Sequence, residues 1–211
     1  MAQKTIKTWD QLKGQSAGVS TYGSLTDFLT RYVLQKHGLQ PEKDVQIIQV
    51  GGGQATLASM KSGKLAEGIL AAPFKWQAAD AGFTKLGSQD QEVAPEWPVH
   101  IYLAKTKFMN DNPNTMKAIL RAHVSALRLA KSDKNYAANV YVNKLKWSAA
   151  DASRAYDEVI GGYNEKGTLP SAASMATFWK IMVDGKFVSE PWPDAKYLDP
   201  RFINTFDQWA P

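Results

Sequence analysis

Three turns in the first half of the sequence together offer hydroxyl groups, glycines and backbone N–H groups, which are groups that bind small anions. The turns are Ser20–Ser24, Gly51–Gln54 and Ala71–Phe74. Each follows a predicted strand and precedes a predicted helix. Because the N-terminus of a helix carries a partial positive charge and unpaired N–H groups, such turns can bind an oxyanion. The alternative is that Ser24 only caps its helix and the glycines only form tight turns.

Aromatic side chains stand beside these turns and could add an apolar wall. Tyr22, Phe74 and Trp76 lie at or just after the ends of predicted strands. In these positions they could line a pocket and stack on a ligand. Further tryptophans lie in the second half of the chain, where packing is the expected role: Trp147, Trp179, Trp192 and Trp209.

Other chemistries lack the residues that they need. The run Gly51–Gly53 does not continue as G-x-G-x-x-G, and no G-K-[ST] segment forms a P-loop, so no nucleotide site is predicted. The three histidines are widely spread, without an acidic partner at the spacing of a hydrolase or zinc motif. The absence of cysteine excludes disulfides, thiol catalysis and cysteine-ligated metals. The sequence therefore predicts no catalytic centre, cofactor or metal site.

The charge of the chain is modest and mixed in sign. The 25 basic and 20 acidic residues give a formal net charge of +5. The densest basic face, Lys117, Arg121 and Arg128, has helical spacing and is predicted to be a solvated surface, so no nucleic-acid partner is expected. No apolar run reaches 18 residues, which excludes a membrane-spanning helix. The opening MAQKTIKTWD lacks the apolar core of an export signal.

Alternating strands and helices position the three turns. The predicted strands are Ser16–Ser20, Val45–Val50 and Leu65–Ala72. A helix follows each of them: one begins after Ser24, with Asp27 completing a near capping box, and the others are Gln54–Lys61 and Phe74–Ala81. This order predicts right-handed crossovers and an α/β fold with a mainly parallel sheet.

The second half of the sequence has a different character. After a proline-rich break at residues 89–98, only Val99–Ala104 has the pattern of a strand. The remaining elements are predicted helices: Asn114–Lys131, Asn135–Lys144, Ser148–Ile160 and Ser171–Asp184. These helices have apolar faces but no sheet of their own to cover. The sequence thus predicts an α/β lobe at residues 8–98 and a return strand with helices at residues 99–211.

Several segments together resemble substrate-binding proteins of ABC importers, in the branch that handles nitrate, sulfonates, taurine and thiamine-pyrimidine precursors. The first is D-Q-L-K-G-Q-S-A-G-V-S-T-Y-G-S at residues 10–24. The resemblance continues through L-x-x-H-G-L-x-P-x-x-D-V at 34–45, V-G-G-G at 50–53 and L-x-S-M-K-S-G-K-L-A-E-G-I-L-A-A-P-F at 57–74. It resumes at K-x-K-F-M-N-D-N-P, residues 105–113.

This resemblance implies a type II periplasmic-binding fold of two lobes, with the ligand held between them. Residues 8–98 would be one complete ligand-binding lobe, whereas residues 99–211 would pack on the sheet of a first lobe. The segment that builds that sheet in the family has no counterpart in this sequence. We therefore expect the apolar faces of the helical part to be buried by self-association, as a swapped or associated dimer, or by rearrangement.

The resemblance and the aromatic pattern together give a predicted ligand-binding set, drawn from all three turns: Thr21, Tyr22, Gly23, Ser24, Gly52, Gly53, Ala72, Pro73 and Phe74. Taurine binders of the family carry an acidic residue near the third turn, but residues 69–74 contain none. A ligand ammonium group is therefore not expected to bind to this lobe.

The expected function is non-catalytic capture of a small oxyanion-bearing ligand, such as a sulfonate, nitrate or organic acid. The resemblance implies an ABC transporter permease as partner and a periplasmic or extracellular location. One alternative is a self-associating or non-binding fragment. Another is an enzyme similar to the fungal thiamine-pyrimidine synthase, but that enzyme depends on a cysteine-rich motif and this chain has no cysteine.

Overall fold

The computed structural model describes residues 1–94, 97 and 99–211. The chain divides into two compact units. The first unit contains Met1–Trp97 and Ser171–Pro191, and the second contains Pro98–Pro170 and Trp192–Pro211. The first unit thus also takes in residues 1–7 and a segment from within the predicted helical part. Within the described ranges, no helix is long and apolar enough to cross a membrane.

A three-stranded parallel sheet forms the centre of the first unit and confirms the predicted α/β class. Its strands are β1 (Ser16–Val19), β2 (Gln46–Gln49) and β3 (Glu67–Gly68), in the order β2-β1-β3. In register, Gly18 of β1 stands opposite Ile48 of β2 and Gly68 of β3. Strand β3 is shorter than the predicted Leu65–Ala72, because only Glu67 and Gly68 pair with β1. Beyond β3, Ala2 bridges Glu67 and Thr84 in antiparallel fashion.

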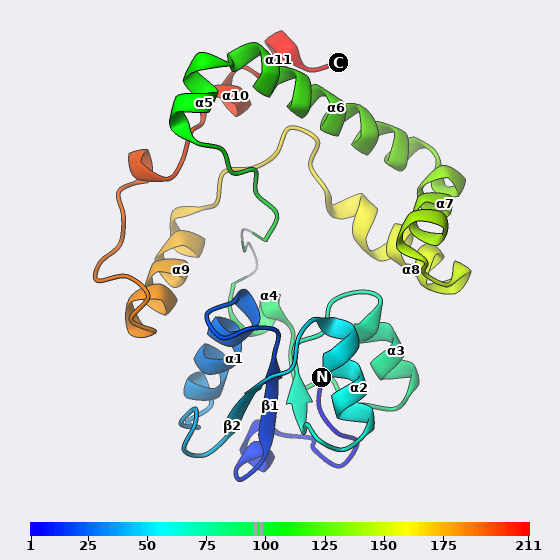
Figure 1. Cartoon of the computed structure of the whole chain (residues 1–211), viewed down its shortest axis with the longest axis vertical. Helices are drawn as coiled ribbons and strands as arrows, with labels where there is room; N and C mark the ends of the chain where they lie inside the picture. Colours follow the sequence, from blue (N-terminus) through cyan, green and yellow to red (C-terminus); the bar gives the residue numbers. More distant parts are fainter. Residues whose placement is uncertain (95–96, 98) are drawn as a thin grey trace. The chain divides into compact units, whose positions relative to one another are not determined.

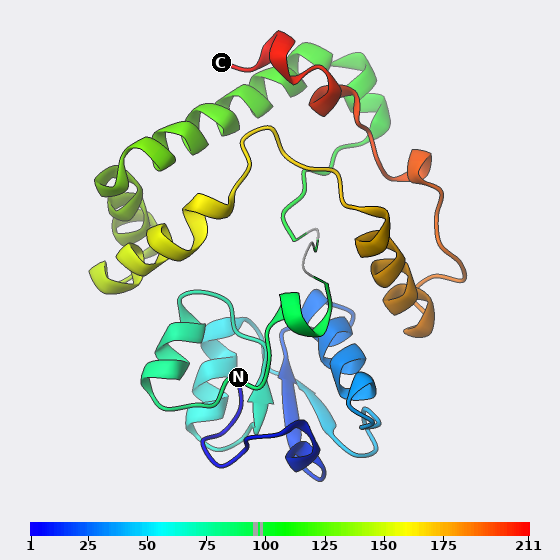
Figure 2. The same ribbon diagram turned by 180° about the vertical axis from the view of Figure 1, so that it is seen from behind.

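Helices cover this sheet on both sides. They are α1 (Leu25–Lys36), α2 (Gly53–Lys61), α3 (Phe74–Asp80) and α4 (Gln89–Glu92), and a short 3₁₀ helix, η1 (Trp9–Leu12), precedes β1. Because the strand order reverses after β2, right-handed crossovers put α1 and α2 on opposite faces. Figures 1 and 2 show α1 on one side of the strands and α2 with α3 on the other. The core of the unit includes Leu12, Val19, Leu34 and Val45.

Helix α9 (Ala172–Asp184) belongs to the first unit, although the sequence analysis placed it in the helical part at residues 99–211. It packs beside α1. The ring centroids of Phe28 and Phe187 lie 4.0 Å apart, and those of Trp97 and Phe178 lie 5.7 Å apart. These aromatic contacts tie the later segment to the α/β lobe.

The second unit is helical among its described residues, as the sequence predicts. Its elements are α5 (Thr106–Asp111), α6 (Pro113–Ser132), α7 (Lys134–Leu145), α8 (Ala149–Val159), η2 (Ile160–Gly162), η3 (Asp194–Lys196), α10 (Arg201–Asn204) and α11 (Phe206–Trp209). The chain end folds back on α6, where Phe202, Phe206 and Trp209 pack with Met116 and Val124. Figure 1 shows α10 and α11 lying along α6.

The strand predicted at residues 99–104 is wrong: the structure shows no strand there. Ile101 is 62% exposed and Leu103 is 84% exposed. A strand is stable only when its backbone groups pair with a neighbouring strand. The described part of the second unit contains no strand that could act as that neighbour. The segment therefore forms no regular element and is exposed, despite its apolar composition.

Candidate functional site

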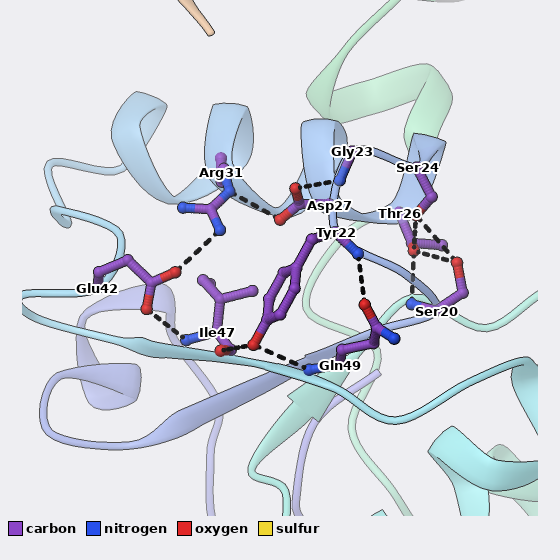
Figure 3. Close-up of polar contacts among 10 residues, drawn as sticks. All are labelled: Ser20, Tyr22, Gly23, Ser24, Thr26, Asp27, Arg31, Glu42, Ile47 and Gln49. Atoms are coloured by element: carbon purple, nitrogen blue, oxygen red, sulfur yellow. Dashed lines mark hydrogen bonds and ion pairs between the residues drawn. The ribbon is translucent and has the colours of Figure 1, made fainter.

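Three hydroxyl groups meet at the end of β1, where the chain turns into α1. The Ser20 Oγ lies 3.0 Å from the Ser24 Oγ and 2.9 Å from the Thr26 Oγ1, and the latter two oxygens are 2.9 Å apart. The backbone N–H of Ser20 also donates to the Thr26 Oγ1, at 2.9 Å. Figure 3 shows these three side chains converging. Each hydroxyl carries one rotatable proton, so this hydroxyl cluster (Ser20, Ser24 and Thr26) can turn a donor toward a ligand oxygen.

The capping box predicted between Ser24 and Asp27 does not form. Ser24 is the N-cap residue of α1, but its side chain makes no capping hydrogen bond because its hydroxyl joins the cluster. The Ser24 N–H donates instead to the Thr21 carbonyl, at 3.1 Å, which closes a turn. Gly23 occupies the third position of this turn with φ of 76°. That left-handed conformation favours glycine, so Gly23 has a structural reason to be there.

The buried carboxylate of Asp27 accepts a hydrogen bond from the backbone N–H of Gly23. The Gly23 N–H donates to Asp27 Oδ2 at 2.9 Å, and Arg31 Nε donates to Asp27 Oδ1 at 2.7 Å. Asp27 is only 3% exposed. Burial acts to lower the pKa of Arg31, but hydrogen bonds to Glu42 and Asp27 outweigh it and raise the pKa above its ordinary value. The Gly23 N–H is thus already used within the protein.

Tyr22 lies along the outer edge of β2. Its N–H donates to Gln49 Oε1 at 3.0 Å, and its hydroxyl donates to the Ile47 carbonyl at 3.2 Å. The same hydroxyl accepts a longer hydrogen bond, 3.4 Å, from the Gln49 N–H. In Figure 3 the ring of Tyr22 points from the turn toward β2 and away from the hydroxyl cluster. Tyr22 therefore hydrogen-bonds to the backbone of β2, while its side chain stays about half exposed.

The second turn lies next to the first. The Gly51 N–H donates to the Ser20 carbonyl at 3.1 Å, so the two turns are joined directly. Gly52 is the N-cap residue of α2, and no atom lies within 4 Å of the place where its Cβ would stand. The backbone at Gly52 is thus open, and the first N–H groups of α2 have no partner within the helix.

The third turn lies next to the second. A Cβ on Gly53 would stand 2.5 Å from Phe74 Cδ2, so the Phe74 ring packs directly on the Gly53 backbone. The Ala72–Pro73 peptide is cis, and the Lys75 N–H donates to the Ala71 carbonyl at 2.9 Å. Trp76 is buried in α3, which makes it a packing residue.

The predicted residues therefore gather at one end of the sheet, although they do not share one role. The links Ser20–Gly51 and Gly53–Phe74 bring the three turns together. Thr21 is exposed at the first turn and uses its carbonyl to close it. None of the nine predicted residues has a charged side chain. The site thus offers hydroxyls, N–H groups and aromatic surface, which suit recognition of an anion by neutral donors.

Four side chains around the site lie outside the predicted ligand-binding set. Ser20 and Thr26 complete the hydroxyl cluster, and the run S-T-Y-G-S-L-T after β1 was the available signal. Asp27 and Arg31 stand four residues apart on α1, a spacing at which side chains of opposite charge meet.

One segment of the sequence fits the G-x-S-x-G pattern of serine hydrolases, but its place in the fold does not support a hydrolase role. Residues 14–18 read G-Q-S-A-G, but Ser16 begins β1, whereas the nucleophile of such enzymes stands at the turn that follows a strand. The Ser16 hydroxyl donates to the Lys64 carbonyl at 3.0 Å. Among the described residues, no group of three or more histidines and acidic side chains could hold a metal ion.

Comparison of the sequence with protein families gives one match that covers most of the chain. A model of the NMT1-like family matches residues 1–142. No curated protein sequence is similar enough to this chain to count as a relative.

Solved structures share the fold, and two of them are structures of periplasmic binding proteins. The periplasmic aliphatic sulphonate binding protein SsuA from Escherichia coli gives a TM-score of 0.71 at 17% identity, over 92% of this chain and 62% of that one. A putative sulfonate ABC transporter protein, the periplasmic sulfonate-binding protein SsuA from Methylobacillus flagellatus KT, gives 0.62 at 19% identity, over 97% and 63%. A protein from Bordetella bronchiseptica RB50 gives 0.64 at 26% identity, over 90% and 61%. This chain thus spans less than two thirds of the length of these structures.

Proposed function

Because this chain belongs to the NMT1-like family, we propose that it is a solute-binding component of an ABC importer that captures a small oxyanion without catalysis. The fold that it shares with periplasmic sulfonate-binding proteins supports this proposal. The proposed ligand carries a sulfonate, nitrate or carboxylate group. The proposed partner is the importer's permease, and the proposed location is the periplasm or the cell exterior.

The observation that carries the proposal is the hydroxyl cluster at the N-terminus of α1. Its three oxygens lie within 3.0 Å of one another, and Ser20 also connects to the second turn through Gly51. Beside it, the open Gly52 backbone begins α2. Hydroxyls and first-turn N–H groups could together bind the oxygens of one anion.

The neutral donors of the site favour ligands with a single negative charge. A dianion costs more to desolvate than a monoanion, and the predicted set contains no cationic side chain that would offset this cost. Near the first turn, the Arg31 cation is already paired with Asp27 and Glu42. Methanesulfonate and nitrate should therefore bind better than sulfate.

Titration calorimetry with matched ligands tests the proposal. Methanesulfonate and nitrate should bind, whereas dimethyl sulfone, which has sulfonyl oxygens but no charge, should not. Ser24→Ala and Thr26→Val should each weaken methanesulfonate binding by about tenfold, the effect of one lost hydrogen bond. Ser132→Ala, which removes an exposed hydroxyl on α6, is the control and should leave binding unchanged. Failure of both anions and of a benzoate probe to bind would contradict the proposal.

A second candidate is self-association through the helical part. It is favoured by the apolar segment Val99–Leu103, in which Leu103 is 84% exposed. Apolar surface of this kind is a common site of protein association. In that case the copies would associate whether or not an anion is present.

A further inference from the structure

We propose that Asp27 and Arg31 are positioning residues, which hold the turn Thr21–Ser24 in the shape needed for ligand capture. This inference rests on the proposed function, because it assigns how the ligand-facing turn keeps its conformation. Neither residue belongs to the predicted ligand set. Both lie on α1 and connect to the turn through hydrogen bonds (Figure 3).

Asp27 fixes the orientation of one peptide group in the turn. Its Oδ2 accepts the Gly23 N–H at 2.9 Å, while its Oδ1 accepts Arg31 Nε at 2.7 Å. Since the side chain is buried, water is poorly placed to substitute for either contact. The carboxylate therefore holds the Gly23 peptide in one orientation, and Arg31 holds the carboxylate.

The arginine extends this connection to the sheet. Arg31 Nη2 donates to Glu42 Oε1 at 2.9 Å, and Glu42 Oε2 accepts the Ile47 N–H of β2 at 3.3 Å. A second connection runs from Tyr22 to the same strand, through the side chain of Gln49 and the carbonyl of Ile47. Two consecutive turn residues, Tyr22 and Gly23, are thus linked to β2 by separate routes.

The turn needs such support because glycine is conformationally free. Gly23 has φ of 76°, a region in which glycine has several accessible neighbouring conformations. The next residue, Ser24, contributes its hydroxyl to the cluster with Ser20 and Thr26. A rotation of the Gly23 peptide would displace that hydroxyl. Asp27 and Arg31 therefore control the site's geometry without contributing a ligand contact.

Hydrogen exchange of the Gly23 amide, measured by NMR without ligand, tests the positioning directly. In Arg31→Leu and Asp27→Asn, this amide should exchange at least about tenfold faster, and its increase should exceed that of the β1 amides. Arg31→Lys keeps the charge and should restore part of the protection. Lys107→Leu, which breaks an exposed pair with Asp111 at the same four-residue spacing, is the control and should match wild type.

Calorimetry with methanesulfonate gives the functional readout, at a temperature where circular dichroism shows every variant folded. Arg31→Leu should weaken binding by about tenfold, and Arg31→Lys by less. An unchanged Gly23 exchange rate, or faster exchange with unchanged affinity, would overturn the inference. If the wild type binds none of methanesulfonate, nitrate and benzoate, the proposed function fails instead, and Gly23 exchange alone decides whether Asp27 and Arg31 hold the turn.

Discussion

The ring of Phe74 rests on the backbone of Gly53, so that a Cβ at position 53 would stand 2.5 Å from Phe74 Cδ2. Because Gly53 has no side chain, two turns that are about twenty residues apart in the sequence can pack against each other. Gly52, the preceding residue, has open space around the corresponding position. These neighbouring glycines thus form a natural pair for a test.

Gly53→Ala should destabilise the protein by about 1–3 kcal/mol, because the methyl group would force the Phe74 ring to move. Gly52→Ala is the matched control and should cost less than about 1 kcal/mol, the usual loss when alanine replaces glycine at a helix N-cap. Urea unfolding followed by far-ultraviolet circular dichroism measures both. Equal effects of the two substitutions would contradict the close contact at Gly53.

Acid should weaken the contact between α4 and the end of α1. Burial acts to raise the pKa of Glu92, but hydrogen bonds from His37 and Lys36 outweigh it and hold the pKa below its ordinary value. A carboxylate with a lowered pKa in the folded state stabilises the protein above its unfolded pKa of 4.5, and this contribution is lost as the pH falls below that value.

Stability measured from pH 7 to pH 3 should therefore fall less steeply in Glu92→Gln than in wild type. Asp111→Asn, which changes an exposed carboxylate on α5, is the control and should keep the wild-type slope. If Glu92→Gln has the wild-type slope as well, the Glu92 carboxylate does not link folding to pH.

Trp209 should be the more important of two tryptophans near the end of the chain. It is buried against α6, and its Nε1 donates to the Phe202 carbonyl at 2.8 Å. Trp209→Ala should cost about 3–5 kcal/mol, the range for removing a buried aromatic side chain. Trp192→Ala should cost no more than about 1 kcal/mol, since Trp192 is 40% exposed. Thermal unfolding by circular dichroism compares them, and similar losses would contradict the packing of the chain end on α6.

The exposed segment Val99–Leu103 predicts reversible self-association. Sedimentation velocity at increasing concentration should show species larger than the monomer, and Leu103→Lys should shift the distribution toward the monomer. Lys105→Glu changes a neighbouring exposed residue and should have little effect. A purely monomeric wild type at high concentration would refute this prediction.

The parts of the fold that depend on local sequence could be predicted. The helix after Ser24 begins where the sequence predicts, and the strand around Ile47 lies within one residue of its predicted bounds. Strand β3 and residues 99–104 depend on a pairing partner, which local sequence does not specify. For this reason β3 was predicted too long, and the strand predicted at residues 99–104 was wrong.

The candidate site also combines features that local sequence predicts with contacts that depend on distant parts of the chain. Ser24 and Gly52 lie in turns that were predicted from the order of strands and helices, and both are the N-cap residues of their helices. Glu42 gave no signal, because its contact with Arg31 depends on a loop 11 residues away. Tyr22 was expected as a pocket wall, and its hydrogen bonds to β2 arise only when the turn folds over that strand. Whether the nine predicted residues bind a ligand stays a prediction.

The hydrogen bonds that Glu42 and Tyr22 make to β2 also cover part of an open strand edge. An open strand edge is a template on which further chains can polymerise into fibrils. Here the Ile47 N–H, the Ile47 carbonyl and the Gln49 N–H are all occupied by side chains. The same residues that shape the first turn thus leave fewer free backbone groups on the β2 edge for a further strand to pair with.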